Sequence, residues 1–265
     1  MLRRRDNPWL ALLLLGLLAA VTPLHAATPE EEGLAIVTEA ERRDTGWKDV
    51  KAEMVMTLTN RHGESSTRAV RIQMLEKTGG DLGLSIFDSP ADVRGTAMLT
   101  HSHATEPDDQ WMYLPALGRV KRIASRNKSG PFMGSEFAFE DLGSQEIAKY
   151  TYRFVGSERV GDADCFVIER RPAYEYSGYT RQVVWLDKEL YQPRKIDYYD
   201  RKDTLLKTQV FSEYQRYLER YHRAGAMHMV NHQTGKETHL EWKDYHFGNG
   251  LSENDFTESR LSRIR

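Results

Sequence analysis

The chain has 265 residues, a formal net charge of −2 at pH 7 and a single cysteine, Cys165. A balance this close to neutral gives no reason to expect nucleic acid as a partner. One cysteine excludes an internal disulfide framework and a cysteine-rich zinc site, and we expect its thiol to be buried and unreactive.

The N-terminus has the pattern of a cleavable signal peptide. Arginines at positions 3–5 precede an apolar run over residues 9–21, and small residues follow around Ala26. The apolar run is shorter than the roughly 20 residues that a membrane-spanning helix needs. We therefore expect a signal peptide over residues 1–26, and a periplasmic mature chain, residues 27–265, that forms one domain. Losing three arginines and Asp6 would take the net charge to about −4.

The first element expected in the mature chain is a helix over residues 28–46. Thr28 has the position of an N-cap, Pro29 follows it at the first helical position, and Glu31 completes a capping box. Gly46 is expected to supply the left-handed cap. The helical spacing of apolar residues predicts one buried stripe, formed by Leu34, Val37 and Ala40.

From Lys51 the apolar period changes to two, which predicts a half-buried strand. Alternation resumes at Val70 after the turn-forming residues 60–64, so the two segments predict an antiparallel hairpin. Residues 89–96 are expected to form a helical turn. Further strands are expected over residues 82–87, 111–114, 152–155, 166–169, 182–186, 195–199, 207–211, 227–231 and 239–245. The spacing of the turns predicts a meandering antiparallel sheet.

Two central segments carry the most specific motif: residues 111–123, WMYLPALGRVKRI, and residues 129–142, SGPFMGSEFAFEDL. Supporting motifs are FDSPADVRGT over residues 87–96 and YQPRKI over residues 191–196. Together they resemble the LolA-like family of outer-membrane lipoprotein-sorting proteins, which includes members found near lipid exporters of the resistance-nodulation-division type. The resemblance implies a mainly β, α+β fold. In it, a curved antiparallel sheet forms an open half-barrel, closed by the N-terminal helix and a central lid over an apolar cavity for acyl chains.

The central segment also has a physical interpretation of its own. Prolines and glycines interrupt regular structure there, while large apolar side chains recur, so the segment must bury one face. It is either a lid over ligand groups or a plug that fills the core, and the sequence leaves both open.

The site residues expected from these patterns fall into two groups. Those expected to line the apolar cavity or its lid are Met54, Met56, Trp111, Tyr113, Leu114, Phe132, Met133, Phe137, Phe139 and Leu142. Methionine adapts to irregular apolar guests, but it is also an ordinary filler of protein cores. Those expected to meet a lipid head group or an acidic partner are Arg119, Lys121 and Arg122, for which a solvated basic face is the alternative.

The sequence supports no catalytic site and no cofactor. It lacks a nucleophile elbow, a phosphate-binding glycine loop and a His-Glu-x-x-His helix, so we expect no enzyme. His101 and His103 are the best metal candidates, but no third ligand follows at regular spacing and no metal is expected. Glu140 and Asp141 are interpreted as structural, capping or hydrogen-bonding the lid.

These expectations combine into a periplasmic carrier. It would bind lipoprotein acyl chains or lipid, contact membranes transiently and help to sort or transfer its cargo towards an outer-membrane acceptor. The alternative is a non-enzymatic accessory protein of an inner-membrane lipid exporter of the resistance-nodulation-division type.

Overall fold

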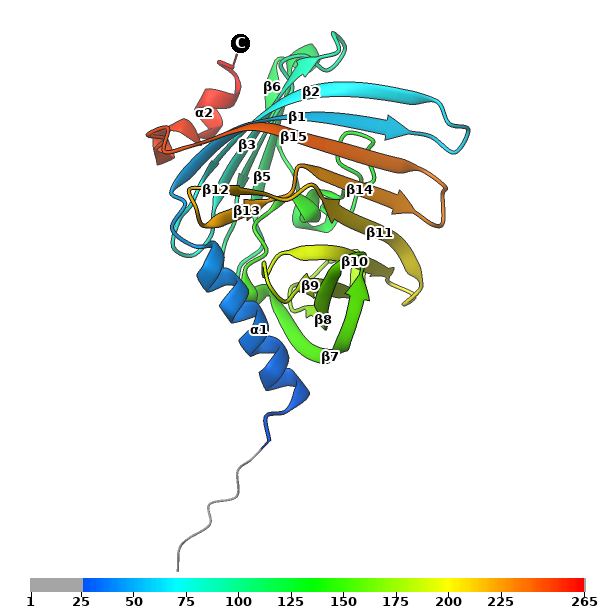
Figure 1. The fold of residues 1–265 in the computed structure, drawn as a ribbon. Helices are drawn as coiled ribbons and strands as arrows, with labels where there is room; N and C mark the ends of the chain where they lie inside the picture. The colour runs from blue at the N-terminus through cyan, green and yellow to red at the C-terminus, as the bar shows by residue number, and fades with distance from the viewer. Residues whose placement is uncertain (1–25, 265) are drawn as a thin grey trace, which may run out of the picture.

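A computed structural model describes residues 26–264, so almost all of the expected signal peptide lies outside the described residues. One 13-stranded antiparallel sheet dominates and curves strongly around a hollow concave side (Figure 1). This confirms the expected open half-barrel. Its strands are β1 (Asp49–Thr59), β2 (Ser65–Leu75), β3 (Leu82–Ser89), β4 (Ala97–His101), β5 (Asp109–Leu114), β6 (Arg119–Arg122), β7 (Tyr150–Val160), β8 (Ala163–Pro172), β9 (Tyr179–Asp187), β10 (Pro193–Asp200), β11 (Leu205–Ser212), β14 (Ala226–Asn231) and β15 (Glu237–Phe247).

The remaining elements are short or peripheral. Strands β12 (Gln215–Tyr217) and β13 (Tyr221–Arg223) form a separate two-stranded ribbon. The α-helices are α1 (Pro29–Asp44) and α2 (Glu258–Leu261), and short 3-10 turns lie at Pro115–Leu117, Ser125–Asn127, Phe139–Leu142, Ile147–Lys149 and Glu253–Asp255. In the described part of the chain, no helix combines the length and apolar character that a membrane crossing requires.

The sheet consists of two meanders joined along one seam. Strands β1 to β6 pair in chain order, as do β7 to β11 followed by β14 and β15, and β1 pairs with β15 at the seam. The free edges are therefore β6 and β7, which are consecutive in sequence but lie at opposite edges of the sheet. Residues 123–149, which we call the crossing segment, must span the sheet, and they do so inside its concave side (Figure 1).

Most strand predictions from apolar alternation are confirmed. In β1 the side chains of Ala52, Met54 and Met56 are buried on one face, and β1 and β2 form the expected hairpin. Strands β4, β6, β12 and β13 were not predicted, because five or fewer residues carry too little periodic signal. The helical turn expected over residues 89–96 is present as a single turn between β3 and β4, in which the Arg94 N–H donates to the Pro90 carbonyl at 3.0 Å.

The two faces of the sheet bury different clusters. The concave face holds the largest cluster, built around Met56, Phe87 and Met229. On the convex face, Leu99 and neighbouring side chains pack under Phe256 and the α2 residue Leu261. Cys165 lies on the convex face of β8 and is fully buried, as expected.

Helix α1 begins as predicted, and of the predicted stripe Val37 and Ala40 pack inward while Leu34 does not. Thr28 and Glu31 form the expected capping box. Leu34 was expected inside, yet it is 47% exposed, and the buried residues are Gly33 and Ile36. Gly46 has a positive φ of 103°, but its N–H donates to a Glu76 carboxylate oxygen at 2.6 Å rather than to a helix carbonyl.

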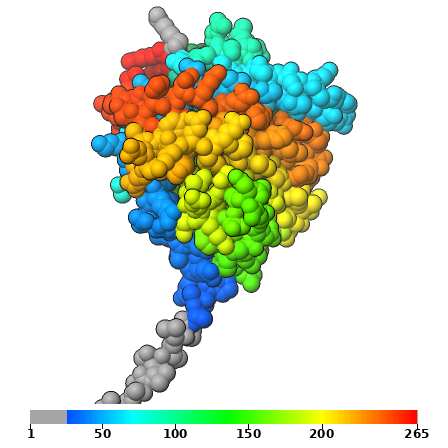
Figure 2. Space-filling view, in the orientation of Figure 1, coloured from blue at the N-terminus to red at the C-terminus, as the bar shows by residue number. Residues whose placement is uncertain are grey.

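The shift at the start of the stripe follows from how closely α1 approaches β7, whose atoms meet those of α1 in Figure 2. A Cβ added at Gly33 would lie 2.8 Å from the backbone nitrogen of Phe154 and 2.9 Å from the carbonyl carbon of Arg153. Only glycine allows this approach without displacing the helix.

We expect Gly33→Ala to destabilise the protein. In the solvent-exposed interior of a helix, replacing glycine by alanine stabilises the protein by roughly 0.5–1 kcal/mol. At Gly33 the clash with β7 is expected to lower the free energy of unfolding by about 1–3 kcal/mol instead. Urea unfolding measures the difference, with Leu34→Ala on the exposed face as the control that stays within about 0.5 kcal/mol. A stabilised Gly33→Ala protein would refute the tight contact.

Candidate functional site

The concave side of the sheet encloses a pocket of about 990 Å³. We call it the concave pocket. Its walls come from α1, from strands of both meanders and from the crossing segment. Most of the lining side chains are apolar, among them Val37, Met54, Met56, Ile72, Met74, Met98, Phe132, Phe137, Leu142, Ile168, Val184, Leu186, Ile196, Phe211, Met227, Leu240 and Trp242.

The crossing segment contributes to the concave side in two ways. Phe132 and Phe137 are almost fully buried, and Phe132 packs against Phe87 and Phe139 with ring centroids 5.8 and 5.7 Å away. This part fills the core. Residues 140–147 instead form a wall of the concave pocket. The first part agrees with the plug interpretation, and for residues 140–147 the lid stays a prediction.

A buried ion pair fixes the crossing segment to the sheet. Nζ of Lys207, a β11 residue that is 2% exposed, lies 2.7 Å from Asp141 Oδ2 and donates to the Glu136 carbonyl at 2.7 Å. Asp141 also accepts from the Ala138 N–H at 2.7 Å and from the Tyr179 hydroxyl at 2.9 Å. Asp141 is therefore structural, as expected.

Further polar contacts fix the segment to both meanders. The Glu140 carboxylate accepts from the hydroxyls of Tyr174 and Ser177 and from the Gly178 N–H, at 2.8–3.0 Å. Burial, with the neighbouring Asp141 charge, raises the pKa of Glu140. On the other meander, Gln110 donates to the Phe139 carbonyl at 2.8 Å.

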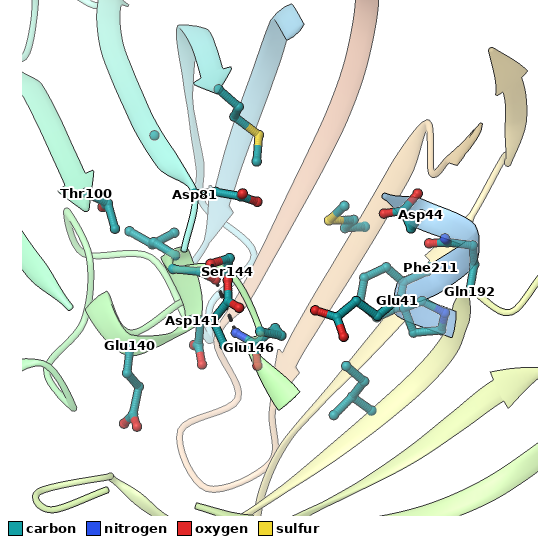
Figure 3. Close-up of a pocket in the computed structure, with 18 of the residues that line it drawn as sticks. Glu41, Asp44, Asp81, Thr100, Glu140, Asp141, Ser144, Glu146, Gln192 and Phe211 are labelled. Atoms are coloured by element: carbon teal, nitrogen blue, oxygen red, sulfur yellow. Dashed lines mark hydrogen bonds between the residues drawn. The ribbon is translucent and has the colours of Figure 1, made fainter. Parts of the chain in front are cut away.

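Part of the concave pocket is lined by carboxylates. In Figure 3, Glu41 and Asp44 of α1 lie on the opposite side of the pocket from Asp81 and Glu146. Burial raises the pKa of Glu41, and the Glu146 charge adds to the effect. Burial also raises the pKa of Asp44, against the opposing influence of its ion pair with Arg223. Burial raises the pKa of Asp81 to about 6, and Glu146 contributes.

Asp81→Asn is expected to stabilise the protein more at pH 7.5 than at pH 4. The folded state holds the Asp81 proton more tightly than the unfolded state, so wild type loses stability as pH rises from about 4 through 6. Asparagine removes that charge while keeping an oxygen for the Lys77 N–H. We expect a gain of about 1 kcal/mol at the higher pH, allowing for solvent screening. Urea unfolding of wild type and Asp81→Asn at both pH values measures the gain, and the exposed Asp162→Asn serves as the control. A gain that is the same at both pH values would contradict the prediction.

The structure brings some of the predicted cavity residues together and separates others. Met54, Met56, Phe132, Phe137 and Leu142 line the concave pocket. Leu114, Met133 and Phe139 pack in the same concave cluster but outside the pocket lining. Trp111 and Tyr113 lie on the convex face, in the cluster beneath α2.

The predicted basic and metal candidates lie elsewhere. Arg119, Lys121 and Arg122 are exposed on the edge strand β6, outside the lining of the concave pocket, and Arg122 pairs with Asp109. His101 Nε2 lies 2.7 Å from the Phe256 carbonyl, and His103 Nε2 lies 3.1 Å from Asp109. No group of three metal-binding side chains occurs within residues 26–264.

The sequence missed the polar part of the pocket wall, which includes Tyr152, Arg170 and Gln182. A signal for one of them was present. In β8, Arg170 is in phase with Phe166 and Ile168, which face α1, so alternation alone places an arginine on the inner face.

Comparisons with known proteins agree with this architecture. A family model described as an uncharacterized protein matches residues 79–263. An outer membrane lipoprotein-sorting protein domain from Vibrio parahaemolyticus is 56% identical, with a TM-score of 0.87 over 88% of this chain and 100% of that one. A DUF1329 family protein from Desulfovibrio piger is 30% identical, with a TM-score of 0.85 over 89% and 100%.

A more distant solved structure shares the fold. A LolA superfamily protein from Nitrosomonas europaea is 19% identical and has a TM-score of 0.68, over 88% of this chain and 98% of that one. No curated protein matches the sequence.

Proposed function

The chain belongs to the family of outer membrane lipoprotein-sorting protein domains and has the fold of a LolA superfamily protein, and we propose that it is a periplasmic protein that binds the acyl chains of a lipoprotein or lipid in the concave pocket. The relative from Vibrio parahaemolyticus is named an outer membrane lipoprotein-sorting protein domain, and we propose a related role for the present chain. The proposed function is binding and carriage, with no covalent step.

The observation that carries the proposal is the size and lining of the concave pocket. Its volume of about 990 Å³ lies at the upper end of the roughly 300–1,000 Å³ typical of ligand sites. At about 0.8 kcal/mol per buried methylene, one long acyl chain supplies on the order of 10 kcal/mol before ordering costs. Met54, Met56, Phe132, Phe137 and Leu142 are the proposed contacts from the original candidates.

The proposal extends to the route of the cargo. Residues 1–26 would direct export, residues 27–265 would form the single carrier domain, and transient contact with a membrane would load and release the ligand. The exposed β6 residues Arg119 and Lys121, and Arg122 if it leaves its ion pair with Asp109, would make such contact with lipid head groups or an acidic partner. An outer-membrane acceptor or an inner-membrane exporter would be the partner.

Native mass spectrometry with lipid extraction tests the proposal. The mature protein is purified gently from a periplasmic fraction, and we expect a stoichiometric acylated ligand to accompany it. If the protein is empty and binds no added lipid or acylated peptide, acyl carriage is wrong. The accessory role beside a lipid exporter then takes its place.

A further inference from the structure

A row of polar side chains crosses the wall of the concave pocket. Tyr152 of β7 pairs with Arg170 of β8, and Arg170 pairs with Gln182 of β9. Residues paired across antiparallel strands project to the same face, and all three line the concave pocket. Polar groups in an otherwise apolar pocket are what fix the orientation of a ligand.

The arginine of this row has no carboxylate partner. Its Nε donates to Gln182 Oε1 at 2.6 Å, and its guanidinium carbon lies 4.7 Å from the centre of the Tyr150 ring. None of the ion pairs found within residues 26–264 involves Arg170. The two terminal guanidinium nitrogens of Arg170 donate to no acceptor within the described residues. They are nevertheless accessible to solvent, and since Arg170 lines the concave pocket, we infer that they face its open space.

The neighbouring groups present further free hydrogen-bonding atoms. Gln182 is only 2% exposed, and since an arginine can only donate, the amide oxygen must face Arg170 and the NH₂ must point away from it. Within the described residues, neither this NH₂ nor the Tyr152 hydroxyl has a hydrogen-bond partner, and neither is sealed from the pocket. Three adjacent strands therefore present unused donors to one space.

The nearby carboxylates do not neutralise this row. Asp141 is paired with Lys207, and Glu140 accepts from Tyr174, Ser177 and Gly178. Glu41 and Glu146 line the same pocket and their charges reach Tyr152, but none of the ion pairs within residues 26–264 joins either of them to Arg170. Arg170 is half-buried and has no paired counter-ion, so a ligand that supplies a negative charge would be favoured beside it.

Resting on the proposed acyl-chain binding, we propose that Tyr152, Arg170 and Gln182 bind an oxyanion carried by the acylated ligand. The chemistry shared by the candidate ligands is a carboxylate or phosphate oxygen pair. The planar guanidinium fork matches such a pair with two parallel hydrogen bonds, and the amide and hydroxyl donors complete the contact. The ligand class is therefore an anionic amphiphile whose chains occupy the methionine-rich part of the pocket.

The test compares matched anionic and neutral amphiphiles. Delipidated wild type and Arg170→Met are titrated with palmitate against hexadecanol, and with dipalmitoyl phosphatidic acid against dipalmitoylglycerol. Wild type should prefer the anionic member by at least about tenfold, and in Arg170→Met the ratio of the anionic to the neutral affinity should fall to about one. The first pair tests carboxylate, and the second tests phosphate.

Two further variants keep the test decisive. Arg171→Met changes the next residue of β8, which is exposed and pairs with Glu169, and should leave the preference intact. Gln182→Glu places a carboxylate beside Arg170 and should remove the preference even if Arg170→Met fails to fold. Equal binding of charged and neutral partners by wild type, or a preference that survives both pocket variants, overturns the inference but leaves acyl binding standing. Wild type that binds none of the amphiphiles overturns the proposed function as well.

Discussion

Lys207→Met is expected to lower the free energy of unfolding by about 3–5 kcal/mol. The substitution leaves the Asp141 carboxylate buried without its cation and removes the donor to the Glu136 carbonyl. It also removes the ammonium group that lies 5.2 and 5.0 Å from the ring centres of Tyr179 and Tyr198. Methionine has nearly the same length, so the loss reports charge and hydrogen bonding rather than a cavity.

The double variant Lys207→Met with Asp141→Asn separates these causes. Asparagine keeps an oxygen for the Ala138 N–H but carries no charge, so we expect about 2 kcal/mol of the loss to be regained. Urea unfolding measures all three proteins, and exposed Lys202→Met serves as the control within about 0.5 kcal/mol. A loss below about 1 kcal/mol for Lys207→Met would show that the pair contributes little to fixing the crossing segment.

Gly83→Trp is expected to weaken the binding of an acyl ligand at least about tenfold without unfolding the protein. Gly83 lies in β3 on the pocket wall, and a Cβ added there meets no other atom within 4 Å. An indole at this position would occupy the space proposed for the ligand. Since an aromatic residue also favours a strand over glycine, we expect stability to stay within about 1 kcal/mol of wild type.

Val210→Trp is the matched control for the pocket-filling variant. Val210 lies on β11 and is 41% exposed, so the added indole stays outside the concave pocket. Native mass spectrometry would give the lipid occupancy of both variants beside wild type. Full occupancy of Gly83→Trp would mean that the ligand lies elsewhere. Phe132→Asp is less informative, because Phe132 is buried and an aspartate there would disturb the fold itself.

The fold was largely predictable because alternation in the long strands reports burial directly. The N-cap of α1 was equally predictable, since Thr28, Pro29 and Glu31 act through local hydrogen bonds and backbone geometry. The buried stripe of α1 was predictable at Val37 and Ala40 but not at its start, because hydrophobicity favours Leu34 whereas the close approach to β7 selects Gly33. Tertiary contact overrode the local pattern there.

The candidate site was predictable only in part for a related reason. Trp111 and Tyr113 were predicted to line the cavity because they belong to the central motif. Successive side chains of a strand point to opposite faces, and in β5 Met112 points to the concave face, so Trp111 and Tyr113 point to the convex one. Arg170 and Gln182 come from strands with no special motif, and only the pairing of β8 with β9 brings them together. The periodicity of a sequence predicts which side chains of one strand share a face. Predicting a pocket also requires knowing which strands lie side by side in the sheet.

The β1–β15 seam has a consequence for how the chain folds. Each meander grows by pairing neighbours in sequence, but β1 meets β15 only after nearly the whole chain between them is available, as in the pairing of Met56 with Leu240. Such a non-local closure is slow, because the entropy of the long loop is lost before the contact forms. Until then β1 is an unprotected edge whose apolar side chains invite pairing with other chains. The period between synthesis and closure is thus when aggregation competes most strongly with folding.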